Sequence, residues 1–281
     1  MDDWQNRTPL VLEVVPSPLR LGERGVEKCL AEVAEIHAAV NLDAINIPEI
    51  REEESKSAQG ERRNPFEPRV EPRRLAARIQ EHLDLECIVN RVVVHRAEPG
   101  QAEWFRETHD RFGVRSFVLV GGEKSQVPYP GPTVPRANQL IRETLGNSLR
   151  RVGNITIPSR RSEIPDEPER MAHKVKCGAS FFTSQIVYQP EELTRLLTDL
   201  ARRCPESARV PILVSLCPLR SARSIAFLRW LGVSLSDSLE ESLDCQRQGL
   251  LERSIQHLLK MWVEIQTQLR EHSLPTPLGL N

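Results

Sequence analysis

The sequence predicts an α/β protein that folds as a closed (β/α)8 barrel of the triosephosphate isomerase (TIM) type. Short, β-branched apolar segments alternate with amphipathic helical segments along the 281 residues, and this alternation is typical of parallel βαβ units. Eight strand segments can be placed, and α/β barrels often reach this length as one domain, so a single domain over residues 1–281 is expected. An open, doubly wound sheet is the alternative interpretation.

The strand segments are short and rich in Val, Ile and Leu. The first is LVLEVVP, residues 10–16, where Glu13 interrupts an otherwise apolar run. Further strands are predicted at 43–49, 86–94, 115–123, 154–159, 181–189 and 210–218. The last residues, PTPLGLN, supply an eighth strand, although its two prolines weaken the pattern.

The helical segments between these strands carry apolar residues at intervals of three and four. They are expected at 26–40, 73–83, 102–113, 135–146, 168–178, 190–204, 221–232 and about 251–271. The last helix carries its apolar stripe on Ile255, Leu258, Leu259, Trp262, Ile265 and Leu269, and a polar, helix-favouring stretch at 236–250 precedes it. Residues 51–73 are charged and contain prolines, which predicts a long, mobile βα loop that is either a binding segment or a solvated excursion.

Composition narrows the class of partner. A formal net charge of −1 and a sequence pI near 6.7 give no overall field towards nucleic acid or an anionic membrane, so a small-molecule partner is expected. The first residues, MDDWQNRTPL, have no basic or apolar leader pattern, and no apolar run is long enough to span a bilayer, which indicates a cytoplasmic protein. The six cysteines lack metal-ligand spacing and are expected to be buried, reduced thiols. The sequence leaves homo-oligomerisation open.

In a barrel the functional site lies at the carboxyl ends of the strands. A buried, unpaired carboxylate is costly, so Glu13 is either one half of a structural ion pair or a working group. Other polar residues at or near strand ends are Asn46, Glu49, Asn90, Glu123, Lys124, Arg160, Arg161, Gln185 and Cys217. Several carboxylates beside amides and basic groups suit proton transfer together with recognition of a polar ring or a phosphate.

The glycine pair before Glu123 and the side chain of Gln185 each have two possible explanations. Gly121 and Gly122 before Glu123 would let the backbone approach a phosphate or a flavin, or they form a tight βα turn, since neither glycine-rich phosphate-binding motif is present. Gln185 lies in a predicted barrel strand, so its amide needs a partner, which is either the protein or a ligand.

The order of these motifs resembles the methylenetetrahydrofolate reductase family, whose members are flavin-dependent barrels of about this length. LEVVP stands where the family has E-F-F-P, HKVKCGASFFTSQ (173–185) is similar to K-V-D-A-G-A-(x)3-I-T-Q, LVGGE (119–123) stands at L-R-G-D, and the terminal G-L-N is similar to T-L-N. The likeness extends over nearly the whole chain at low identity.

The resemblance implies roles for particular residues. Glu13 takes the place of the general acid, and Glu123 replaces the aspartate that faces the pterin and the flavin. Gln185 matches the glutamine that contacts folate, and Lys174 matches a lysine near the flavin phosphates. The full candidate set is catalytic Glu13 and Glu123, substrate-binding Gln185 and Glu49, and cofactor-binding Asn90, Gly121, Gly122, Arg160, Arg161 and Lys174.

The resemblance also implies a reaction, the reduction of 5,10-methylenetetrahydrofolate to 5-methyltetrahydrofolate by hydride from reduced FAD or directly from NAD(P)H. Several flavin-binding residues of the family are replaced, since its arginine is Gly121 and its histidine is Asn90. A folate-binding barrel without redox activity, such as a methyl-transfer partner or a regulatory subunit, is therefore the alternative. A third candidate, an aldolase or lyase barrel, would need an inward-facing lysine on a strand, and no predicted strand supplies one.

Overall fold

The computed structural model describes residues 4, 6–52, 66–122, 128–160, 165–233, 235 and 249–281. Eight parallel strands form one sheet in the order β1 to β8. The strands are β1 (Val11–Glu13), β2 (Ala44–Ile47), β3 (Glu86–Val92), β4 (Ser116–Val120), β5 (Arg151–Thr156), β6 (Phe181–Ser184), β7 (Ile212–Val214) and β8 (Leu278–Leu280). An isolated parallel bridge between Leu10 and Leu280 brings β8 beside β1 and closes the ring. The predicted (β/α)8 barrel is confirmed.

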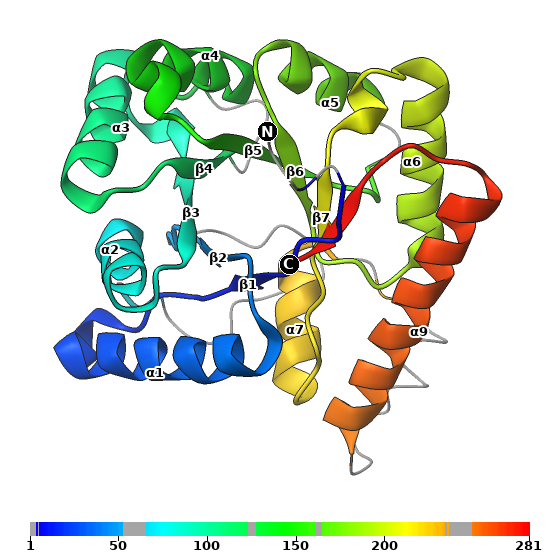
Figure 1. Ribbon diagram of the computed structural model, residues 1–281, viewed down its shortest axis with the longest axis horizontal. Helices are drawn as coiled ribbons and strands as arrows, with labels where there is room; N and C mark the ends of the chain where they lie inside the picture. Colours follow the sequence, from blue (N-terminus) through cyan, green and yellow to red (C-terminus); the bar gives the residue numbers. More distant parts are fainter. Residues whose placement is uncertain are drawn as a thin grey trace.

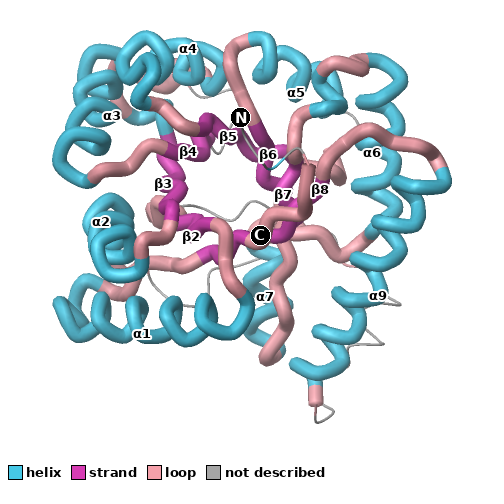
Figure 2. Tube along the Cα trace, viewed as in Figure 1, coloured by secondary structure: helices cyan, strands magenta, loops and turns pink. Residues whose placement is uncertain are grey.

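Helices surround the strands (Figures 1 and 2). They are α1 (Gly22–Val40), α2 (Pro72–Leu83), α3 (Glu98–Phe112), α4 (Val134–Leu145), α5 (Glu167–Lys176), α6 (Pro190–Arg203), α7 (Ala222–Trp230) and α9 (Leu250–Glu271). Four of them begin with proline at one of the first two positions and an extended residue before it, as at Thr133 and Asp166, whose side chains also cap α4 and α5. Local sequence therefore determines where these helices start.

The helices bury one face each against the outer surface of the barrel. On α2 the predicted stripe holds, because Leu75 and Ile79 are fully buried. On α9 it holds only in part, since Leu258 and Ile265 are buried while Leu259 is 60% exposed. Leu259 follows Leu258 on the helix, so the rotation of about 100° per residue turns it away from the core.

The interior of the barrel contains an apolar layer near the amino-terminal ends of the strands. Six inward side chains and the indole of Trp4 form one cluster, made of Val11, Ala44, Ile88, Val118, Phe181, Leu213 and Trp4. Trp4 is 2% exposed and packs edge-on against Phe181, with ring centroids 5.4 Å apart. Trp4 thus acts as a plug in this layer, and the guanidinium of Arg151 lies over it, 4.1 Å from the Trp4 ring centroid. A side chain from outside the sheet thus fills this end of the barrel.

Several strand boundaries differ from the prediction. The strands β1, β4, β6 and β7 end at Glu13, Val120, Ser184 and Val214, three to five residues before their predicted ends, so Gln185 follows β6 instead of lying inside it. The fifth strand starts at Arg151 rather than at residue 154, because Arg151 enters the barrel and pairs with Glu86 of β3. From the sequence alone, a charged residue such as Arg151 is assigned to a loop, because the partner that would stabilise it inside the barrel lies 65 residues away. Residues 53–65 of the predicted loop and 236–248 of the predicted polar stretch lie outside the described residues.

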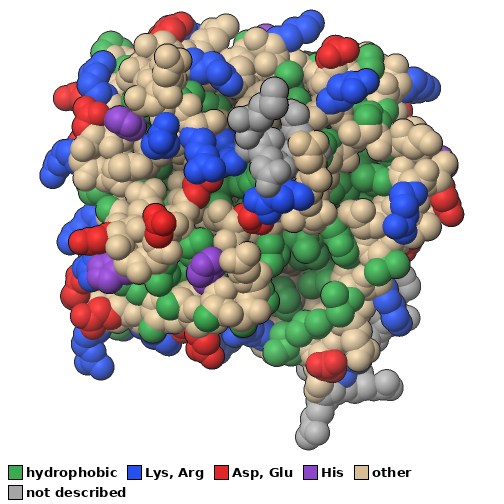
Figure 3. All heavy atoms as spheres, viewed as in Figure 1, with side chains coloured by type: hydrophobic (Ala, Val, Ile, Leu, Met, Phe, Trp, Pro, Cys, Tyr) green, Lys and Arg blue, Asp and Glu red, His purple; other side chains and the backbone are tan. Residues whose placement is uncertain are grey.

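The remaining sequence expectations concern the charge of the surface, membrane-spanning segments and the state of the cysteines. In Figure 3, Lys and Arg side chains are interspersed with Asp and Glu over the face shown, and a hydrophobic area lies between α7 and α9. No helix among the described residues is long and apolar enough to cross a membrane. Five described cysteines are free thiols, but only Cys87 is fully buried, while Cys29, Cys177, Cys204 and Cys217 are partly exposed.

Candidate functional site

A polar layer lies directly above the apolar layer, towards the carboxyl ends of the strands. Side chains on one strand face the same side at every second residue, so the residue two positions after each member of the apolar layer also faces inward. This rule selects Glu13, Asn46, Asn90, Val120, Thr183 and Ser215. Asn281 joins them at the end of β8, because its Nδ2 atom donates to Ser215 Oγ at 3.0 Å. The mouth of the barrel is therefore lined mainly by one carboxylate, three amides and two hydroxyls.

Glu13 is the acidic group of this layer. Its Oε2 atom accepts a hydrogen bond from Asn46 Nδ2 at 3.1 Å, and the side chain of Asn281 also bonds it. The side chain is exposed at the open mouth, yet the surrounding protein removes enough solvent to raise the pKa of its carboxyl group. The two amide bonds oppose that rise only partly. Glu13 is thus accessible to a ligand and easier to protonate than an ordinary glutamate.

Three amide oxygens in the same layer lack a protein partner. Asn46 Oδ1, Asn90 Oδ1 and Asn281 Oδ1 are buried and accept no hydrogen bond from the described residues. Buried polar atoms are nearly always satisfied, so these acceptors beside an accessible carboxylate are free to accept hydrogen bonds from N–H groups of a ligand. Asn46 and Asn281 lie on β2 and at the end of β8, the two neighbours of β1, and Asn90 lies one strand further on, in β3.

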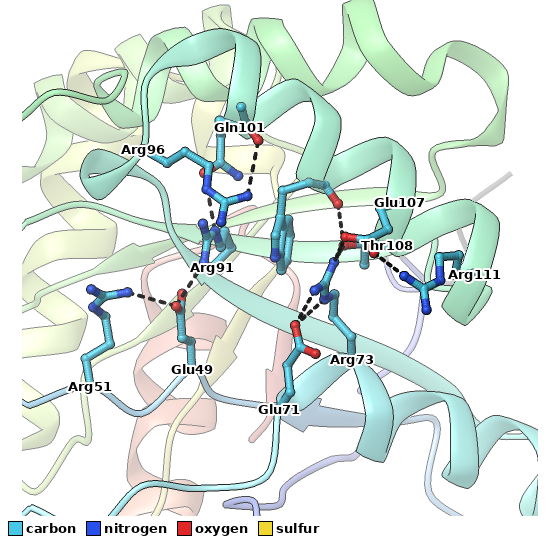
Figure 4. Close-up of polar contacts among 12 residues, drawn as sticks. Glu49, Arg51, Glu71, Arg73, Arg91, Arg96, Gln101, Glu107, Thr108 and Arg111 are labelled. Carbon is cyan, nitrogen blue, oxygen red and sulfur yellow. Dashed lines mark hydrogen bonds and ion pairs between the residues drawn. The ribbon is translucent and has the colours of Figure 1, made fainter.

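Glu49 does not face this layer. Its carboxylate accepts from Arg91 Nη1 at 2.9 Å and from Arg51 Nη1 at 3.1 Å (Figure 4). It also accepts from the backbone N–H of Val92 at 2.8 Å. Arg91 in turn stacks on the ring of Trp104, 4.5 Å from its centroid. These contacts occupy the carboxylate and join the end of β2 to β3 and α3.

Gln185 is also engaged within the protein. Its Nε2 atom donates to the carbonyl of Leu231 at 3.2 Å, and its Oε1 atom accepts from the backbone N–H of Ile186 at 3.1 Å. These bonds tie the end of β6 to the turn that follows α7. Glu123 and Arg161 lie outside the described residues.

The residues that the family resemblance assigns to the flavin have internal partners. Lys174 Nζ donates to the carbonyl of Ile155 at 2.8 Å, and Arg160 Nη1 donates to Glu167 Oε2 at 2.7 Å. Burial lowers the pKa of Lys174 to about 8, with Glu167 opposing that change and Arg160 and Arg170 adding to it. Both cationic groups therefore take part in a network that joins β5 to α5, which holds them in place within the protein.

At the glycine pair after β4, a side chain of the protein lies against the backbone of the second glycine. A Cβ atom on Gly122 would lie 2.4 Å from the ring of Tyr129, so the tyrosine ring already lies against the backbone there. Tyr129 also packs edge-on against His95, with ring centroids 5.4 Å apart. Among the described residues, the assigned set does not fit a flavin, because Tyr129 fills the space over Gly122, and Lys174 and Arg160 bind their own protein.

Comparison with known proteins identifies the family resemblance independently. The sequence model of the methylenetetrahydrofolate reductase family matches residues 140–266, just under half of the chain. The resemblance to this family is confirmed. A search of curated proteins finds no match.

Solved structures support the fold of the whole chain. An uncharacterised protein from Clostridium thermocellum that binds two copies of 5-methyl-5,6,7,8-tetrahydrofolic acid aligns with a TM-score of 0.77 and 19% identity, over 99% of this chain and 90% of that one. A dihydropteroate synthase from Xanthomonas albilineans aligns with a TM-score of 0.50 and 14% identity, over 98% and 86%. At these identities the alignments establish the barrel architecture.

The sequence prediction of the site was incomplete. Asn46 stood among the polar strand ends without a role, and Asn281 matched a family motif without one. The two-residue alternation from the apolar layer would have selected Asn46 and Ser215 directly. The bond from Asn281 to Ser215 joins residues 66 positions apart, and no local pattern signals it.

Proposed function

We propose that this protein binds a reduced folate at the mouth of its barrel and reduces 5,10-methylenetetrahydrofolate to 5-methyltetrahydrofolate. One observation carries the proposal, the accessible carboxyl of Glu13 with a raised pKa among three unpaired amide oxygens. A reduced pterin ring supplies the N–H groups that those oxygens lack. The family match and the folate-binding relative with the same fold support the choice of ligand.

The chemistry requires a proton and a hydride. Glu13 gives its proton to the nitrogen that bridges the pterin and the aminobenzoyl part, the bond from that nitrogen to the methylene carbon breaks, and an iminium forms on the other nitrogen. Hydride from C4 of NAD(P)H then adds to the methylene carbon, giving the methyl group and NAD(P)+. Glu13 regains its proton from solvent at the open mouth. A carboxyl group with a raised pKa suits this task, because it holds a proton closer to neutral pH.

The hydride donor in this proposal is the nicotinamide itself. The described residues do not fit a flavin, since Tyr129 lies over Gly122 and Lys174 donates to the carbonyl of Ile155. No step of the proposed reaction therefore passes through FAD.

The same observation favours one alternative, a folate-binding barrel without redox activity. The internal bonds of Lys174 and Arg160 remove two groups that would otherwise hold a cofactor. Binding of 5-methyltetrahydrofolate without any NAD(P)H oxidation would identify this second function.

The test is an anaerobic assay of NAD(P)H oxidation with 5,10-methylenetetrahydrofolate, using purified protein with and without added FAD. The proposal expects oxidation that requires the folate, produces 5-methyltetrahydrofolate and does not need FAD. Glu13→Gln should abolish the rate, whereas Glu27→Gln on the exposed face of α1 should leave it unchanged. Normal turnover by the Glu13→Gln variant would overturn the assigned role.

A further inference from the structure

The surroundings of Glu13 contain hydrogen-bond donors on both sides. Asn46 Nδ2 donates to Oε2 at 3.1 Å from β2, and Asn281 bonds the same carboxylate from β8. An ionised carboxylate only accepts, so the Asn281 bond also uses its amide N–H group. Both amides therefore turn their nitrogen towards Glu13 and their oxygen away from it.

The orientation of Asn281 is fixed by a chain of hydroxyl and carbonyl groups. Ser215 Oγ donates its single hydrogen to the carbonyl of Ser184 at 2.8 Å. It can then only accept from Asn281, whose Nδ2 lies 3.0 Å away. A flipped amide would place Asn281 Oδ1 against an oxygen whose hydrogen is already committed. The backbone adds to this, because Asn281 N–H donates to the carbonyl of Val214 at 2.9 Å.

This arrangement has a consequence for the protonated form of Glu13. Its O–H group needs an acceptor, but the oxygens of Asn46 and Asn281 are directed elsewhere and bond nothing in the described protein. The proton therefore has no acceptor in the amide pair and, at the exposed mouth, is accessible to solvent or to a ligand atom. A basic nitrogen at the mouth is the acceptor that completes the set.

We infer that Asn46, Asn281 and Ser215 are positioning residues that keep the Glu13 proton directed at the nitrogen of a bound reduced folate. The inference rests on the proposed function for the identity of the ligand. It adds that the hydrogen bonds from Asn281 to Ser215 and from Ser215 to Ser184 fix the orientation of the Asn281 amide. This orientation decides which atom the Glu13 proton can reach.

Few other titratable groups act on Glu13. Among the described residues, Cys217 after β7 is the group whose pKa Glu13 raises, secondary to burial, and Arg220 opposes that effect. The partners on β2 and β8 are uncharged amides, so removing their N–H groups changes hydrogen bonding to Glu13 without changing charge.

The experiment measures the titration of Glu13 by NMR of protein labelled with 13C at the glutamate carboxyl, with the Glu13 signal assigned by its loss in Glu13→Gln. Asn281→Leu removes one N–H donor, which destabilises the carboxylate and should raise the pKa of Glu13 by about 1. Ser215→Ala releases the Asn281 amide, which can then turn its oxygen to the Glu13 O–H group. The pKa should rise in this variant too.

Two serine variants provide matched controls. Ser215→Thr keeps the hydroxyl and should titrate as the unmodified protein does. Ser180→Ala removes a hydroxyl that bonds Val152 at the opposite end of the barrel, and it should leave Glu13 unchanged. Thermal unfolding of each variant checks that it is folded.

Kinetics add a second readout. Ser215→Ala should lower kcat by roughly 10-fold with a smaller change in KM for the folate, because the proton is held by Asn281 instead of the ligand. An unchanged Glu13 titration in both Asn281→Leu and Ser215→Ala would overturn the inference. Since the titration needs no turnover, absence of NAD(P)H oxidation in the unmodified protein would count against the proposed reaction alone.

Discussion

The two ends of the barrel each hold a glutamate inside the sheet, and their partners differ. At the amino-terminal end, Glu86 accepts from Ser116 Oγ at 2.5 Å, from Arg150 Nη1 at 3.1 Å and from the guanidinium of Arg151. At the carboxyl-terminal end, the partners of Glu13 among the described residues are the amides of Asn46 and Asn281. The partners of Glu86 thus include two cations, whereas the partners of Glu13 are neutral amides that only partly oppose the rise in its pKa caused by burial. This difference in partners supports a structural role for Glu86 and the proposed role of Glu13 as a proton donor.

The surroundings of the two ends agree with this division. At the amino-terminal end, Trp4 is buried in the apolar layer, and Arg151 lies over its ring. The carboxyl-terminal end leaves Glu13 exposed and three amide oxygens unpaired. The comparison predicts that changes at one end affect stability and that changes at the other affect activity.

The largest effect is expected from Glu13→Gln. The amide keeps the shape but has no acidic proton, so folate-dependent NAD(P)H oxidation should fall by about 100-fold to 10,000-fold. The melting temperature should stay close to that of the unmodified protein, because an exposed carboxylate without a cationic partner contributes little to stability. A large loss of stability with activity retained would break the comparison between the two ends.

The opposite result is expected from Glu86→Gln. It leaves the guanidinium of Arg151, which is 4% exposed, without its carboxylate, and breaking a buried pair costs about 3–5 kcal/mol. Urea unfolding monitored by circular dichroism measures this loss. The fraction that remains folded should bind 5-methyltetrahydrofolate with unchanged affinity, and weaker binding would show that the two ends are coupled.

Trp4→Ala should have a somewhat smaller effect on stability. The substitution removes the plug from the apolar layer, including the contact with Phe181 and the stacking under Arg151, and buried Trp→Ala changes cost about 3 kcal/mol or more. Trp4→Phe is the matched variant and should recover part of the loss. Equal stability of Trp4→Ala and the unmodified protein would mean that the plug does not contribute.

The smallest expected effect is on the pH dependence of stability, and it concerns Lys174, whose ammonium group donates to the carbonyl of Ile155. Its pKa falls from 10.5 to about 8 on folding, so between these values the unfolded chain binds more protons than the folded one. Stability should therefore rise as the pH increases from about 8 to 10.5 and be at its lower level below pH 8. Thermal unfolding across this range should show the rise, and Lys174→Met should reduce it. An identical pH slope in both proteins would refute the assignment to Lys174.

The sequence was sufficient for the architecture because the barrel is encoded locally. Each strand is a short apolar run and each helix an amphipathic segment with its own start signal, so all eight strands and the described helices were placed within a few residues. The start of β5 was missed, since Arg151 reads as a loop residue until its partner Glu86 is known. Trp4 was missed for the same reason, because a plug depends on contacts with distant strands.

The sequence predicted those site residues whose position depends only on their place in a strand, and it did not predict those whose position depends on contacts with distant residues. Glu13 stood out as a carboxylate inside an apolar strand, and the structure brings it to the barrel mouth. Glu49 was predicted to bind substrate, but its bond to Arg91 joins residues 42 positions apart and cannot be foreseen from spacing. The unpaired oxygens of Asn46, Asn90 and Asn281 are visible only after every other hydrogen bond has been assigned.

The most direct test of the central claim is a crystal structure of the protein with 5-methyltetrahydrofolate. We expect the pterin in the barrel mouth, with a ligand nitrogen within hydrogen-bond distance of Glu13 and N–H groups donating to the oxygens of Asn46, Asn90 or Asn281. A folate bound elsewhere, with Glu13 and these oxygens still without a ligand, would contradict it.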